Sequence, residues 1–153
     1  MKGVLKWPLI IAVIVVVGRV ALERAGVPES ATNYLSAAVL HLLIVPLYLA
    51  VRISGADVPH PYWTLIKTIT IYSAAVRLMI MVTYWLAYIY QWPETRFSLQ
   101  AGGVVGEGIT PVEAIVFRPV LAALAWIVSS IVIGGGLGAL VIAVRRRMVA
   151  SPS

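Results

Sequence analysis

The hydrophobic positions of the chain fall into four long runs, separated by short segments that hold proline, glycine and charged residues. The runs cover about residues 5–24, 30–53, 61–90 and 111–146. A helix that crosses a lipid bilayer needs roughly 20 mostly apolar residues, and each run has about this length or more. The pattern predicts an all-α polytopic integral membrane protein, with residues 1–153 forming one domain of four transmembrane helices.

The boundaries of the runs carry the signals of helix ends. Pro28 follows the first run, and proline cannot continue a helix. Pro61 opens the third run, at a position where its missing N–H is tolerated. Thr110 and Glu113 have the spacing of a capping box at the start of the fourth run. Pro119 lies inside the fourth run, where we expect it to kink the helix.

Composition supports this class and excludes several kinds of site. The chain is 61% hydrophobic and 12% charged, against about 45–50% and about 25% in a soluble domain. It has no cysteine, which excludes disulfides, thiolate metal sites and cysteine nucleophiles. No nucleophile–base–acid grouping and no metal-ligand spacing stands out. The sequence therefore favours a protein that is not an enzyme, without deciding the question, and it requires no cofactor.

Basic residues are distributed unevenly between the two ends of the predicted helices. The end with both termini and the second loop holds seven of the twelve: Lys2, Lys6, Arg52, Lys67, Arg145, Arg146 and Arg147. The basic excess predicts that both termini lie in the cytoplasm, and we expect the cytoplasmic (inner) membrane of a prokaryote. This bias also explains most of the net charge of +6, so the charge does not indicate nucleic-acid binding.

One connection is long and rich in glycine. Residues 91–109 join the third and fourth predicted helices and lie on the outer side in this topology. The glycines do not form a nucleotide-binding pattern after a strand, which excludes that function. Long loops are commonly either disordered or functional, so the segment is a flexible outer loop, a lid or a docking site for a partner.

Arg77 is the most informative single position. It lies near the middle of the third run, where an ionised side chain costs on the order of 3 kcal/mol or more. Counting about 1.5 Å per residue from the cytoplasmic ends places Arg19, His41 and Arg77 at depths of about 20, 18 and 16 Å. The three basic side chains are therefore expected to share one layer of the bundle.

Other polar residues follow this layer along the helices. Ser73 and Tyr84 share a helix face with Arg77, and Tyr48 shares one with His41. The nearest acids are Glu23 and Glu113, which are the candidate counter-ions. The cluster either binds an anionic or electron-rich group, such as a lipid head group, a quinone carbonyl or a small anion, or serves only to hold the helices together.

His41 raises the question of haem. The other histidine, His60, lies in a predicted cytoplasmic loop, so two histidine ligands from one chain are not expected. A pair of His41 side chains from two copies of the chain stays open, beside the simpler interpretation of a hydrogen-bonded interior histidine.

The fourth run carries two faces of small residues, which let helix backbones approach closely. One face consists of Ser130, Gly134 and Gly138, and the other of Gly135, Ala139 and Ala143. Two such faces allow both an internal contact and an external partner.

Three functions follow from these features. The first is a small non-enzymatic accessory or structural subunit that packs against a larger membrane complex, respiratory or photosynthetic. The second is a transporter or channel for an anion or small solute, which uses the Arg/His cluster. The third is a membrane redox protein that binds a quinone or haem. The expected partners are membrane lipids and other membrane subunits or further copies of the chain.

Overall fold

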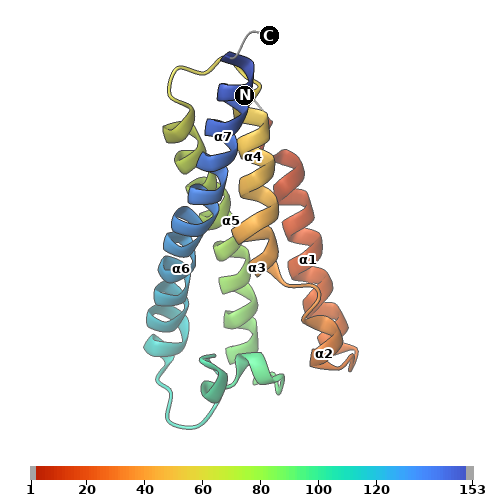
Figure 1. Ribbon diagram of the computed structural model, residues 1–153. Coiled ribbons are helices and arrows are strands. Elements are labelled where there is room, and N and C mark those ends of the chain that lie inside the picture. The colour runs from red at the N-terminus through yellow and green to blue at the C-terminus, as the bar shows by residue number, and fades with distance from the viewer. Residues whose placement is uncertain (1–2, 151–153) are drawn as a thin grey trace.

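The computed structural model describes residues 3–150 and is a bundle of long helices (Figure 1). No β-strand occurs among these residues. Three helical segments are long and apolar enough to cross a membrane, namely Glu29–Ser54, Pro61–Tyr90 and Glu113–Met148. The prediction of an all-α chain with helices able to span a membrane is confirmed at this level.

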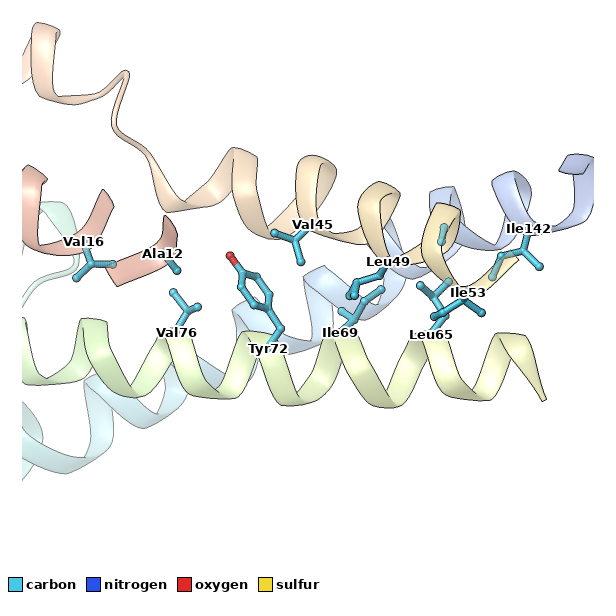
Figure 2. Packing of buried hydrophobic residues seen from close by; sticks show 11 residues of the cluster. Ala12, Val16, Val45, Leu49, Ile53, Leu65, Ile69, Tyr72, Val76 and Ile142 are labelled. Atoms are coloured by element: carbon cyan, nitrogen blue, oxygen red, sulfur yellow. The ribbon is translucent and has the colours of Figure 1, made fainter. Parts of the chain in front are cut away.

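Helix α1 (Lys6–Arg24) corresponds to the first predicted span. Its 19 residues include four charged ones, three of them in the last six positions, so it is less apolar than the three segments above. Its buried residues Ala12 and Val16 nevertheless belong to the same core as Val76 (Figure 2). Helix α1 therefore packs along the bundle.

The second predicted span is divided into several elements. These are α2 (Glu29–Thr32), α3 (Ala37–Val39), the π-helical turn η1 (Leu40–Ile44) and α4 (Val45–Ser54). Ser36 has an extended backbone, and its hydroxyl accepts a 3.2 Å hydrogen bond from the Ala38 N–H, which begins the second helical part. The continuous helix is 18 residues long, or about 27 Å, which is close to the hydrocarbon thickness.

Two π-helical turns occur just before prolines. Proline lacks an N–H and crowds the carbonyl four residues earlier. The turn η4 (Glu113–Phe117) precedes Pro119, which lies in the first turn of α6 (Arg118–Ser129). Pro119 has no N–H to donate to the carbonyl of Ile115. This carbonyl instead accepts a 2.8 Å hydrogen bond from the indole N–H of Trp85. The helix therefore accommodates Pro119, where a kink was expected, by a widened π-helical turn.

The core forms where α4, α5 (Pro61–Tyr90) and α7 (Gly135–Ala150) meet (Figure 2). The turn η5 (Ser130–Gly134) joins α6 to α7 and faces η1. A Cβ at Gly134 would lie 2.4 Å from Cγ of Pro46, and one at Gly138 would lie 2.8 Å from a methyl of Leu65. The first small-residue face is therefore used inside the bundle.

Residues 91–112 fold back over one end of the bundle, opposite the 55–60 connection (Figure 1). Helix α5 ends at Gln91 in a left-handed conformation, and two short 3₁₀ turns follow: η2 (Thr95–Phe97) and η3 (Leu99–Ala101). The side chains of Phe97 and Val104 are almost completely buried, and the Phe97 carbonyl accepts hydrogen bonds from the N–H groups of Val104 and Val105. The segment is a folded cap with its own packed interior.

Candidate functional site: two arginine-lined cavities

Arg77 is held inside the bundle by its position in α5. It is the seventeenth of the 30 residues of this helix and is 9% exposed. Its Cζ lies 4.3 Å from the ring centroid of Trp126 in α6, and a desolvated cation–π contact of this kind contributes about 2 kcal/mol. Its Nε is buried and has no hydrogen-bond partner among the described residues.

The two predicted counter-ions do not pair with Arg77. The Glu113 carboxylate accepts hydrogen bonds of 3.0 and 2.9 Å from the N–H and hydroxyl of Thr110, so it caps its own helix. Glu23 lies 2.8 Å from Arg19 and 2.8 Å from Arg96, the latter outside hydrogen-bond angles. Nearer groups occupy each carboxylate, so neither acid pairs with Arg77, while Glu23 is the counter-ion of Arg19 in the same cluster.

Two cavities adjoin the Arg77 side chain. The first has a volume of about 80 Å³, lies between α5, α6 and the cap, and is also lined by Arg118 and Gly102. The second has a volume of about 190 Å³ and lies between α1, residues 35–38 and α5. Four residues line both cavities: Arg77, Ile80, Tyr84 and Trp126. Arg77 and Trp126 therefore stand at the boundary between the two spaces.

The walls of both cavities are strongly cationic. Arg118 lines the first, Arg19 and Arg96 line the second, and Arg77 lines both. No aspartate or glutamate of the described residues lines either cavity. Burial lowers the pKa of the Arg96 guanidinium, and the carboxylate of Glu23 offsets part of this shift. The walls thus carry more positive charge than nearby carboxylates neutralise.

Ion pairs fasten the cap to the end of α1. Glu23 lies between Arg19 and Arg96, while Arg24 donates a 3.0 Å hydrogen bond to Glu94. Arg19 also donates to the side chain of Asn33 at 2.9 Å. Arg19 therefore belongs both to this network and to the wall of the second cavity.

His41 and Arg77 contact the same indole. The His41 ring centroid lies 6.4 Å from that of Trp126 and 5.3 Å from that of Tyr72. Nδ1 of His41 lies 2.8 Å from the Ala37 carbonyl oxygen, and the residue is fully buried. In this arrangement the ring does not lie at the surface, where a haem ligated by His41 from two copies of the chain would need it.

The remaining predicted site residues divide between the interior and the surface. Tyr84 lines both cavities, and Ser73 is fully buried with an unpartnered hydroxyl. Tyr48 is 36% exposed, so it does not share the buried position of His41. In the second small-residue face, a Cβ added at Gly135 would meet no neighbouring atom within 4 Å.

Sequence reasoning missed three residues of the site. Trp126 had a usable signal, because it lies deep in an apolar run and not at an interface where tryptophans gather. Arg118 stands directly before Pro119, and nothing else in the sequence marks it as a site residue. Arg96 had no comparable signal, since its position depends on how the cap folds.

Comparison with protein-family models, with curated proteins and with solved structures finds no match. The chemistry of the site is therefore argued from its geometry. Guanidinium groups offer several N–H donors in a planar fork that matches carboxylate and phosphate oxygens. Buried arginines without enough carboxylates are suited to hold an anionic group.

Proposed function

We propose that this chain is an integral membrane protein that binds an anionic oxygen-bearing group, a phosphate or carboxylate, at the Arg77 cavities. One observation carries the proposal: Arg77 is nine-tenths buried, has a free Nε and lines both cavities, yet has no carboxylate partner among the described residues. A buried charge without an ionic partner is costly, and a bound anion would offset the part of this cost that the Trp126 ring leaves.

The packing favours a binding site over an open channel. Between Arg77 and the 55–60 end, α5 carries Tyr72, Ile69 and Leu65, each at most 1% exposed. These side chains belong to the packed core of the bundle (Figure 2). Both cavities instead lie toward the cap, so the proposed anion enters from that end.

The membrane arrangement proposed with this function has four spans. Helix α1 contributes the fourth span because its apolar face joins the core of the bundle. The positive-inside bias supports cytoplasmic termini and a prokaryotic inner membrane. The cap and its ion pairs then lie on the outer side.

Binding of inorganic phosphate and sulfate to the purified protein in detergent tests the function, with isothermal titration as the measurement. We expect Arg77→Leu to abolish binding and Arg77→Lys to weaken it, since lysine keeps the charge without the planar fork. Arg52→Leu is the matched control, because Arg52 is exposed in the last turn of α4 at the other end of the bundle. Equal binding by Arg77→Leu and the unaltered protein would refute the site.

A second candidate function is an accessory subunit of a larger membrane complex. It is favoured by the open space at Gly135 and Gly136, where a built Cβ meets no atom within 4 Å. Small residues with open space let another helix approach closely. Stable co-purification with other membrane subunits in mild detergent, lost on Gly136→Leu, would support this function.

A further inference from the structure

We propose that the anionic group is the head group of an anionic phospholipid, and that one of its acyl chains lies in an apolar groove on η4 and α6. This inference rests on the proposed function and names its ligand. The observation behind it is that Arg118 lines two neighbouring spaces. One is the first cavity, which it shares with Arg77, and the other is the groove.

The groove has the apolar composition that a hydrocarbon chain requires. Its volume is about 550 Å³, and its apolar lining consists of Val116, Phe117, Val120, Leu121 and Leu124. These residues recur at spacings of three and four, so they form one face of the continuous η4–α6 helix. An acyl chain on this face stays within the apolar layer.

The polar end of the groove matches a phosphate. One N–H of Arg118 donates a 3.2 Å hydrogen bond to the Gly103 carbonyl, and a guanidinium has five N–H donors in total. Arg118 and Arg77 both line one small cavity. Glu113 also lines the groove, and its carboxylate, bonded to Thr110, stays ionised and offsets only part of the positive charge of Arg118 and Arg77. The charge balance therefore favours an anionic head group.

The position of Arg118 in the chain favours a lipid over a soluble anion. It is the sixth residue of the apolar segment Glu113–Met148, close to the boundary of the predicted span. Lipid phosphates lie at that boundary, and the planar fork of an arginine matches phosphate oxygens. A soluble anion would use the cavity and leave the groove empty.

Native mass spectrometry of the purified protein tests the proposal. The probes are detergent micelles doped with dioleoyl phosphatidylglycerol or with dioleoyl phosphatidylcholine. We expect preferential retention of one phosphatidylglycerol, and retention about tenfold weaker in Arg118→Gln, because a charge-assisted hydrogen bond is lost. Arg52→Gln is the control for the removed charge.

A second pair of variants tests the groove without changing charge. Val120→Trp fills the groove and is expected to weaken retention about tenfold. Val132→Trp makes the same change at an exposed position that does not line the groove, and it should retain the lipid normally. Melting curves of all four variants show whether each is folded.

The outcomes separate this inference from the function on which it rests. Loss of the lipid in both Arg118→Gln and Val120→Trp, with both controls normal, supports the lipid site. Binding of inorganic phosphate without selective lipid retention overturns the lipid inference and leaves the anion site standing. Equal retention of both lipids also overturns it. Binding of neither phosphate nor lipid removes both proposals.

Discussion

The guanidinium of Arg77 lies over the indole of Trp126, with 4.3 Å between Cζ and the ring centroid. This pair takes the place that a salt bridge would have in the middle of the bundle. The ring face provides partial negative charge without a second ion that must be removed from water. It leaves the Nε of Arg77 free, and that group lies at the boundary of two cavities.

Replacing the indole should therefore cost stability. We expect Trp126→Leu to lower the free energy of unfolding by about 2 kcal/mol, because Arg77 loses its only described cation–π partner. Trp126→Phe keeps an aromatic face and should recover part of the loss. Thermal unfolding in detergent measures both, with Trp63→Leu as control because Trp63 is 66% exposed. Identical effects of Leu and Phe would show that the ring face contributes nothing.

Two adjacent glycines should respond oppositely to the same change. A methyl group at Gly134 would lie 2.4 Å from Cγ of Pro46 and 3.3 Å from the Leu42 carbonyl, so Gly134→Ala should destabilise the protein by about 1–3 kcal/mol. Gly135 has open space there, so Gly135→Ala should be neutral or stabilise by about 1 kcal/mol. The two melting temperatures check this, and a stable Gly134→Ala variant would show that the η1–η5 contact is loose.

The sequence predicted the helical runs because their signals are local. Apolar length, prolines and the capping box act within one segment, and the Thr110–Glu113 cap is present. The break before Ala37 was missed, although the polar residues Thr32, Asn33 and Ser36 precede it and serine is a common N-cap residue. The form of the disturbance at Pro119 also depends on a distant residue, Trp85, whose indole takes up the freed carbonyl.

The site was predictable only in its central residue. Arg77 stands out in an apolar run, and Tyr84, which helical spacing puts on the same face, lines the same two cavities. Its surroundings come from tertiary packing. Glu23 lies 2.8 Å from Arg96, and not beside Arg77, because the 91–112 cap folds back onto α1. Depth counting cannot find that contact, since it treats each helix separately and leaves loops out.

The ion pairs between α1 and the cap should limit how often the cap opens to a protease. Glu23→Gln removes the carboxylate that Arg19 and Arg96 share, so the cap should open more often. We expect trypsin to cleave after Arg96 about tenfold faster, corresponding to about 1.4 kcal/mol less protection. The matched control is Glu29→Gln, an exposed glutamate in α2. An unchanged cleavage rate would show that the carboxylate of Glu23 does not hold the cap.

The proposed four-span topology can be tested by thiol labelling, because the chain has no cysteine of its own. Single variants Ser30→Cys, Gln100→Cys, Asp57→Cys and Trp7→Cys place one thiol at an exposed position each. In intact cells, a membrane-impermeant maleimide should label the first two, which lie at the cap end. It should label the other two only after the membrane is permeabilised, because they lie at the 55–60 end.

The position of α1 decides between four spans and three. Its first turn carries the exposed Trp7, and its last turn lies beside the cap through Arg24 and Glu94. If α1 crosses the bilayer, Trp7→Cys is protected in intact cells together with Asp57→Cys. Labelling of Trp7→Cys from outside, with Asp57→Cys still protected, would mean that α1 lies on the outer surface. The second cavity would then be open to the outside along α1, and its arginines would form a surface site.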